Sequence, residues 1–168
     1  MIIVSTGTNG DAFDRLLEAA VRLETEEDLL LQHGPSSIRR AGAKHVDYLS
    51  FAEYESLVEE AGVVITHAGV GSVLLALLHG KRPVLMPRLA RFGEAVDDHQ
   101  LDFASRLRDS GLAELAEDAD SLQAVVDAMT AKDASPATPE RMALVQDLGE
   151  YLAGAVGSAG ARGRTPAR

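Results

Sequence analysis

Short apolar runs alternate with amphipathic helical segments along most of this chain, and the alternation limits the possible folds more than any other feature. The run at residues 63–65 is Val-Val-Ile, which is typical of a strand buried on both faces of a parallel sheet. A glycine turn and a helical segment follow it. Repeated alternation of this kind predicts an α/β fold, a doubly wound, Rossmann-like parallel sheet with right-handed crossovers.

The same periodicities predict the individual elements. One helical face near the N-terminus carries Phe13, Leu16, Leu17 and Ala20. Strands are expected at residues 2–4, 29–31, 46–49, 63–65, 84–86 and 113–115. Further helices are expected at 51–61, from 71 to near 80, at 98–108 and at 120–129.

A single domain is expected, because 168 residues suffice for one hydrophobic core but not for two ordinary ones. It covers residues 1–152. Residues 131–139 are rich in Ala, Ser, Pro and Thr and indicate a linker before a last helix at 139–152. Residues 153–168 are small, basic and low in complexity, which predicts a disordered tail.

Composition and charge exclude several classes of protein. The formal net charge of −10 argues against a general nucleic-acid binder, which needs clustered Lys and Arg. The chain has no cysteine for a disulfide framework. It begins without the basic and apolar regions of a signal peptide, and no apolar run reaches the roughly 20 residues of a membrane span. A cytoplasmic location is therefore expected.

The first candidate binding element is the turn TGTNG at residues 6–10, between a predicted strand and a predicted helix. In open α/β sheets, ligands bind beyond the carboxyl ends of the strands. Backbone N–H groups of this turn can face phosphate or sugar hydroxyl groups. A plain strand-to-helix turn without a ligand explains the same residues equally well.

A second glycine turn, THAGVGS at residues 66–72, follows the buried run at 63–65. Gly69 and Gly71 allow close approach of a diphosphate, and the dipole of the following helix favours negative charge there. The turn is not a P-loop, and Leu74 replaces the third glycine of the dinucleotide fingerprint. His67 is either a ligand contact or a strand-end histidine bonded within the fold, and both readings stay open.

Mixed charges gather in a third element, PRLARFGEAVDDHQ at residues 87–100, which follows a predicted strand and runs into a helix. Side chains in such a loop can reach a bound ligand. Helix capping by Asp97 or Asp98 is the alternative for those two acids, although a cap does not require His99 and Gln100.

The run HAGVGSVLLALLHGKRPVLMPR and the block DDHQ together resemble the C-terminal domain of family 28 glycosyltransferases. The resemblance covers about residues 1–152 and is greatest for split enzymes in which this domain is a separate chain. It implies the C-terminal half of a GT-B fold, which binds a UDP-sugar. It also implies transfer of the hexosyl group to a lipid-linked saccharide acceptor, as in exopolysaccharide synthesis.

The resemblance also implies site residues. The donor diphosphate and its cleft are expected to contact seven residues of the two glycine turns: Thr6, Gly7, Thr8, His67, Gly69, Gly71 and Ser72. Backbone at residues 49–51 is expected to meet the uracil. The donor sugar or its pocket is expected to contact four residues of the third element: Glu94, Asp98, His99 and Gln100. Arg88 is expected to neutralise the leaving diphosphate, with an ordinary surface arginine as the alternative.

One position departs from the family pattern. Related enzymes often carry a glutamate three residues after the Gly-Ser pair, where it holds the ribose hydroxyls, and this chain has Leu75 there. The uridine assignment consequently depends on the resemblance rather than on an identified ribose ligand.

Neither a metal site nor a cofactor is expected, because the five histidines are scattered rather than placed at ligand spacing. Helix dipoles and backbone donors stabilise the departing UDP instead. The first predicted strand starts at Ile2, which leads us to expect a second, membrane-anchored chain that supplies the acceptor site and the general base. No catalytic residue of this chain is identified.

Two other functions fit parts of the pattern. A non-catalytic nucleotide-binding or regulatory subunit with the same fold is favoured by Leu75. A dinucleotide-dependent oxidoreductase domain is disfavoured by the incomplete glycine fingerprint. Binding of NADH or of UDP distinguishes the second alternative from a glycosyltransferase.

Overall fold

A computed structural model describes residues 1–131 and shows one six-stranded parallel sheet. Its strand order is β3-β2-β1-β4-β5-β6. The strands are β1 (Ile2–Ser5), β2 (Leu29–Gln32), β3 (Lys44–Val46), β4 (Val63–Thr66), β5 (Val84–Leu85) and β6 (Glu114–Leu115). This is the doubly wound, Rossmann-like sheet that the sequence predicts, so the fold prediction is confirmed.

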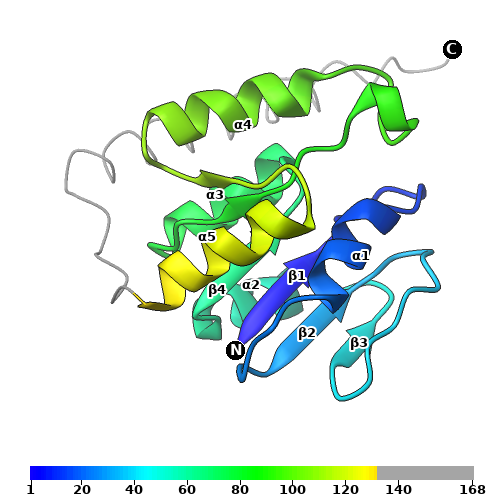
Figure 1. Ribbon diagram of the computed structural model, residues 1–168, viewed down its shortest axis with the longest axis vertical. Coiled ribbons are helices and arrows are strands. Elements are labelled where there is room, and N and C mark those ends of the chain that lie inside the picture. The colour runs from blue at the N-terminus through cyan, green and yellow to red at the C-terminus, as the bar shows by residue number, and fades with distance from the viewer. Residues whose placement is uncertain (132–168) are drawn as a thin grey trace, which may run out of the picture.

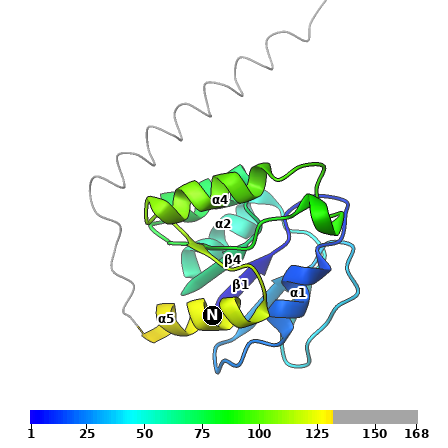
Figure 2. The same ribbon diagram turned by 45° about the horizontal axis from the view of Figure 1, so that its top comes forward.

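Helices cover both faces of the sheet (Figure 1). They are α1 (Asp14–Val21), α2 (Phe51–Glu60), α3 (Val70–Leu78), α4 (His99–Asp109) and α5 (Ala119–Ala131), with a 3-10 turn η1 (Ala90–Phe92). Figure 2 shows α1 and α5 on one side of the central strands and α2 and α4 on the other. The result is a three-layer α/β/α arrangement.

Alternate residues of the central strands pack into opposite layers, as the two-residue period of a strand requires. Ile2 and Val4 of β1 belong to the cluster that α1 and α5 cover, together with the predicted helical face of Phe13, Leu16, Leu17 and Ala20. Ile3 belongs to the cluster beneath α2 and α3. A third cluster joins α3 to α4. The sheet is therefore buried on both faces.

Pairing of β1 with both β2 and β4 places the topological switch point at the centre of the sheet. The register aligns Ser5 with Thr66, so both strands end at the same level. The chain leaves β1 toward α1 on one face and leaves β4 toward α3 on the other. The two glycine turns therefore begin side by side.

The strand predicted at residues 46–49 is displaced, because the structure has β3 at Lys44–Val46. Lys44 and His45 pair with Leu30 and Leu31 at the edge of the sheet, where polar side chains reach solvent. The apolar residues that suggested a later strand include Leu49, which lies in the loop before α2. An edge strand does not need an apolar sequence, and this explains the error.

The other elements agree with the prediction to within a few residues. Helix α3 starts at Val70 rather than Gly71, and α5 continues to Ala131, the first residue of the predicted linker. The rest of that linker, the helix expected at 139–152 and the tail expected at 153–168 lie outside the described residues. None of the helices in residues 1–131 is both long and apolar enough to cross a membrane.

Candidate functional site

A pocket of about 380 Å³ opens at the carboxyl ends of β1 and β4. Both glycine turns contribute to its wall, together with the ends of β1 and β2 and the start of α2. Its lining residues are Ser5, Gly7, Thr8, Gln32, Leu49, Ser50, Phe51, Tyr54, His67, Gly69, Val70, Gly71, Ser72 and Leu75. A concave site at the switch point of a parallel sheet is a preferred ligand site of this fold.

The imidazole of His67 packs between the two glycine turns. A Cβ atom on either Gly7 or Gly69 would overlap the ring, and Gly7 also has a left-handed φ of 80°. Both positions therefore require glycine for space, and Gly7 requires it for its backbone conformation as well. The His67 ring acts as a spacer that fixes the distance between the two turns.

Burial, together with the positive charge of Arg88, lowers the pKa of His67 to about 4. A backbone hydrogen bond with Ser5 offsets part of this effect. The Nδ1 atom lies 3.2 Å from the hydroxyl of Thr66. At neutral pH the pocket therefore contains an uncharged imidazole.

Gln32, at the end of β2, forms hydrogen bonds with three segments around the pocket: the end of β1, the first glycine turn and the loop before α2. Its Oε1 atom accepts hydrogen bonds from the Ser5 hydroxyl at 2.8 Å and from the Gly7 amide at 3.1 Å. Its Nε2 atom donates to the carbonyl oxygens of Gly7 at 3.0 Å and Asp47 at 2.8 Å. One buried amide thereby sets the path of the first glycine turn and ties it to the loop before α2.

The start of α2 forms the wall of the pocket near residues 49–51. Ser50 caps the helix by accepting from the Glu53 amide, while the Glu53 carboxylate accepts from the Ser50 amide at 2.8 Å. This capping box fixes where α2 begins. The adjacent side chain of Phe51 is 70% exposed and forms part of the pocket rim.

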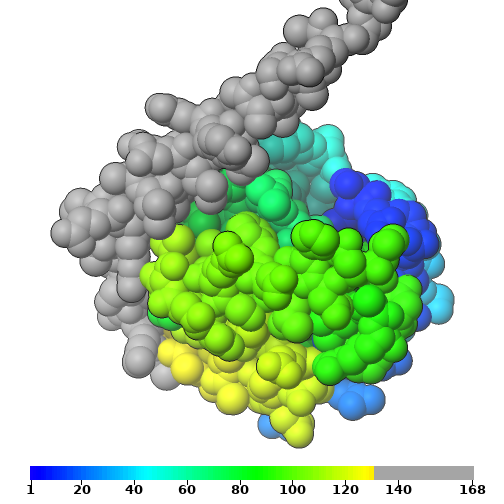
Figure 3. Space-filling view, turned by 90° about the horizontal axis from the view of Figure 1, so that it is seen from above, coloured from blue at the N-terminus to red at the C-terminus, as the bar shows by residue number. Residues whose placement is uncertain are grey.

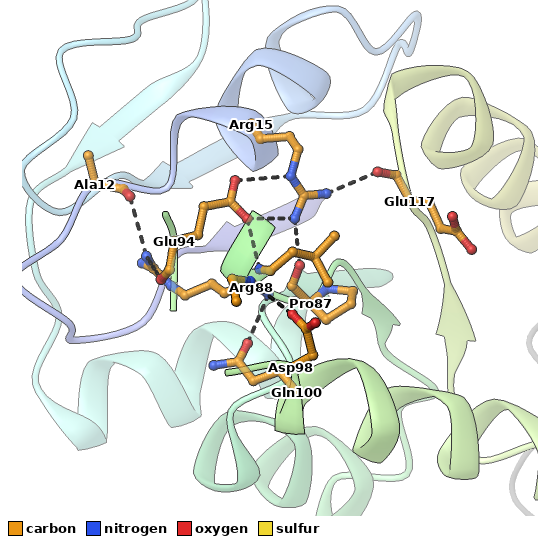
Figure 4. A network of polar contacts seen from close by, with 10 residues as sticks. Ala12, Arg15, Pro87, Arg88, Glu94, Asp98, Gln100 and Glu117 are labelled. Atoms are coloured by element: carbon orange, nitrogen blue, oxygen red, sulfur yellow. Dashed lines mark hydrogen bonds and ion pairs between the residues drawn. The ribbon is translucent and has the colours of Figure 1, made fainter. Parts of the chain in front are cut away.

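Arg88 is buried and holds the other side of the first glycine turn (Figure 4). Its Nη2 donates to the carbonyl oxygens of Thr6 at 3.2 Å and Asp11 at 3.1 Å, and its Nη1 donates to that of Ala12 at 3.3 Å. The guanidinium also lies over the Phe13 ring, 4.6 Å from the ring centre. Burial lowers the pKa of Arg88, while the carboxylates of Glu94 and Asp11 oppose the shift.

The third element contacts helix α1 through a second arginine. Glu94 forms a two-pronged ion pair with Arg15 of α1, at 3.0 and 2.8 Å, and also accepts from the Leu89 amide (Figure 4). Seen from above in Figure 3, the bright green loop before α4 lies beside the dark blue segment that follows β1. The loop after β5 is thus fastened to the start of α1.

The site residues predicted from the sequence separate into two groups. Six of them line the pocket: Gly7, Thr8, His67, Gly69, Gly71 and Ser72. Six do not line it: Thr6, Arg88, Glu94, Asp98, His99 and Gln100. The ligand roles of both groups stay predictions.

Most members of the second group make contacts inside the protein. The Thr6 hydroxyl donates to the Gln32 carbonyl at 3.2 Å, and the Asp98 carboxylate accepts from the Ala90 amide at 2.8 Å. The side-chain amide of Gln100 accepts from the backbone amide of Arg88 at 3.1 Å.

The sequence left other roles open for Asp98 and Arg88. Asp98 occupies the N-cap position of α4 without a capping hydrogen bond, whereas the His99 side chain is exposed beside Asp97. Arg88 is not the surface arginine that the sequence left open, because it is buried.

Sequence reasoning missed three polar residues of the pocket, Ser5, Gln32 and Tyr54. Gln32 follows the predicted strand at 29–31, and a polar side chain at the carboxyl end of a buried strand is a recognisable signal. Tyr54 shares the buried face of α2 with Leu57, Val58 and Ala61, at helical spacing. That spacing indicated a core position and concealed the polar end of the side chain.

Metal ligation has no candidate in the described part of the chain. No group of three or more acidic or histidine side chains in residues 1–131 is placed to hold an ion. The polar groups that face the pocket are backbone amides, hydroxyls, one side-chain amide and one imidazole. Such groups bind anionic and hydroxylated ligands.

Residues 1–151 match the glycosyltransferase family 28 C-terminal domain. This chain belongs to that family. No curated protein has a matching sequence. The domain is therefore a glycosyltransferase C-terminal domain, a class consistent with binding of a nucleotide-sugar donor.

Solved glycosyltransferases share the fold of this domain. The calicheamicin glycosyltransferase CalG4 superposes with a TM-score of 0.61 at 19% identity, over 87% of this chain and 38% of that one. The spinosyn forosaminyltransferase SpnP gives a TM-score of 0.63 at 17% identity, over 89% and 39%. MurG of Acinetobacter baumannii gives 0.57 at 22% identity, over 77% and 40%. The chain thus spans about two fifths of these structures, and at such identities the likeness shows the fold alone.

Replacement of Arg88 tests whether its buried guanidinium is structural. We expect Arg88→Lys to lower the free energy of unfolding by about 2 kcal/mol, because one ammonium group cannot replace the forked contacts with several carbonyl oxygens. Urea unfolding measures the change. Arg91→Lys is the matched control, since Arg91 is exposed on η1. Unchanged stability of Arg88→Lys with loss of nucleotide binding would instead support contact with the diphosphate.

The lowered pKa of His67 predicts a pH-dependent stability. In the unfolded chain this histidine binds a proton near its ordinary pKa of 6.5, whereas the folded protein resists protonation until about pH 4. Because protonation favours the unfolded chain, the free energy of unfolding decreases as the pH falls from the ordinary pKa toward the folded one. The decrease is about 2 kcal/mol between roughly pH 7 and pH 5. In urea unfolding at both pH values, His67→Gln should lose less stability than the wild type by this amount. Equal losses would contradict the prediction.

Proposed function

We propose that this domain binds a UDP-sugar in the pocket between β1 and β4 and serves as the donor-binding half of a GT-B hexosyltransferase. The observation that carries the proposal is the meeting of two glycine turns with the N-terminus of α3 in one pocket. The first amides of an α-helix lack partners within the helix and attract anions. Val70, Gly71 and Ser72 present such amides at the pocket wall.

The dimensions and chemistry of the pocket support a nucleotide ligand. Its volume of about 380 Å³ falls within the range of small-molecule sites. The cradle for the diphosphate combines the turn after β1 with the first turn of α3. The wall at Leu49, Ser50 and Phe51 offers backbone groups and an apolar surface to the base. Charge that develops on departing UDP is stabilised by the helix dipole, without a metal ion.

A second chain completes the active site in this proposal. It is anchored in the membrane, binds the lipid-linked saccharide acceptor and supplies the general base, and it draws this domain to the inner face of the membrane. The rim of the pocket supports such a cover, because Phe51 and Val70 are exposed apolar residues there, 70% and 42% accessible. Closure of the rim would exclude water from the transferred sugar.

A non-catalytic nucleotide-binding subunit is the second candidate, and Leu75 favours it. This side chain is 5% exposed and lies in the pocket wall, at the position where related enzymes often carry a glutamate for the ribose. Sugar transfer by the co-expressed pair of chains distinguishes the two functions. Binding of UDP without any transfer would favour the non-catalytic subunit.

A charge placed at Gly71 tests the diphosphate cradle. A Cβ atom on Gly71 meets no other atom within 4 Å, and an acidic residue in the first turn of a helix favours the helix. We expect Gly71→Asp to keep its melting temperature and to weaken UDP binding at least about tenfold, because its carboxylate repels the diphosphate. Calorimetric titration with UDP measures the affinity.

Gly71→Asn is the matched control for this experiment, since it has the same size without the charge. It should bind UDP more tightly than Gly71→Asp. Equal UDP affinity of the wild type and Gly71→Asp would contradict the proposed position of the diphosphate. Binding of NADH in preference to UDP would favour the oxidoreductase alternative instead.

A further inference from the structure

Four apolar side chains line the pocket where α2 and α3 face each other. Leu49 and Phe51 lie at the start of α2, and Val70 and Leu75 belong to α3. Leu75 is 5% exposed and packs with Ile3 in the core cluster beneath the two helices. A leucine fixed by core packing therefore forms part of the pocket wall.

A bound nucleotide brings its ribose to this wall. In the proposed function, the base lies at residues 49–51 and the diphosphate at the first turn of α3. The ribose joins the base to the diphosphate, so it lies between the starts of α2 and α3. Tyr54 packs against the same cluster as Leu75, and its hydroxyl oxygen is inaccessible to solvent. Both residues consequently offer carbon atoms to the ribose rather than hydrogen-bonding groups.

The pocket lining contains no acidic side chain among the described residues 1–131. Carboxylates in the flanking segments are engaged elsewhere. Glu53 accepts from the Ser50 amide at 2.8 Å, and Asp47 lies 3.1 Å from the imidazole of His33. Ser72 offers a hydroxyl to the pocket, and a neutral hydroxyl forms a weaker hydrogen bond than a carboxylate does. Recognition of a ribose hydroxyl here is therefore weak.

Selection for ribose requires a group that depends on the 2′-hydroxyl. Dinucleotide-binding domains use an aspartate or glutamate that hydrogen-bonds this hydroxyl. A site of that kind rejects an analogue without the hydroxyl, because the acceptor is left without its partner. An apolar wall has no such acceptor, and it does not strongly reject an added hydroxyl either.

We propose that Leu75 makes this pocket accept ribonucleoside and 2′-deoxyribonucleoside diphosphates alike. The donor class then extends from UDP-sugars to sugars carried on a deoxyribonucleoside diphosphate. This inference deepens the proposed function and rests on it, because it requires a nucleotide in the pocket with its diphosphate at α3.

The first experiment titrates the wild-type full chain with UDP and with 2′-deoxy-UDP by calorimetry. We expect the two dissociation constants to agree within about threefold, because no charged acceptor distinguishes the two sugars. A preference for UDP of about tenfold or more overturns the inference and leaves the proposed function intact. Failure of both nucleotides to bind overturns the proposed function as well.

The second experiment introduces the missing acceptor with Leu75→Glu. The new charge weakens binding of both diphosphates, so the measured quantity is the ratio of the dissociation constants for 2′-deoxy-UDP and UDP. We expect this ratio to rise at least about tenfold, as for a hydrogen bond to a charged group. Leu74→Glu is the matched control, since Leu74 is partly buried on the same helix but does not line the pocket. Its ratio should equal that of the wild type.

An unchanged ratio in a folded Leu75→Glu variant overturns the role given to Leu75. If the melting temperature shows that the core cluster does not tolerate the charge, Leu75→Gln replaces this variant. Glutamine has the same size as glutamate and a neutral acceptor, so a rise of about threefold is expected. An unchanged ratio in Leu75→Gln overturns the role of Leu75 in the same way.

Discussion

Parallel pairing of β1 with β4 is the constraint on which the pocket depends. The register ends both strands at the same level, and the connections then leave toward opposite layers of the fold. A concave space between the two exits follows from this geometry, without a dedicated insertion. Glycine at positions 7 and 69 allows the His67 ring to fit between the turns. The spacing of the cradle is therefore set by backbone pairing and one aromatic spacer.

The turn after β1 is held from two directions. Gln32 fixes it from the pocket, whereas Arg88 binds its carbonyl oxygens from the third element (Figure 4). A loop with both sides fastened loses little further conformational freedom when it binds a ligand. Burial lowers the pKa of His67, and the positive charge of Arg88 adds to this effect. Arg88 therefore affects both the path of the turn and the charge state of His67, although it does not line the pocket.

The fold and half of the candidate site could be predicted from the sequence. Apolar alternation fixes the layers, and glycines after buried strands mark the cradle because few other residues tolerate such turns. The strand at β3 was misplaced because an edge strand tolerates Lys44 and His45. Gln32 did carry a local signal, as a polar residue at the end of a buried strand, whereas the apolar spacing of α2 concealed the pocket position of Tyr54. Likewise, a loop arginine such as Arg88 gives no sign of its burial.

The pocket is held together by contacts between residues distant in sequence, and this affects when it forms during folding. Thr66 bonds to Ser5 across 61 positions, and Arg88 reaches Asp11 across 77. Contacts so distant in sequence form slowly, because loop-closure entropy opposes them until the intervening chain is organised. During synthesis, β1 is made before β4 and before the segment around Arg88, so the pocket cannot form until both later segments have left the ribosome. Completion of the pocket is consequently a late event in the folding of this domain.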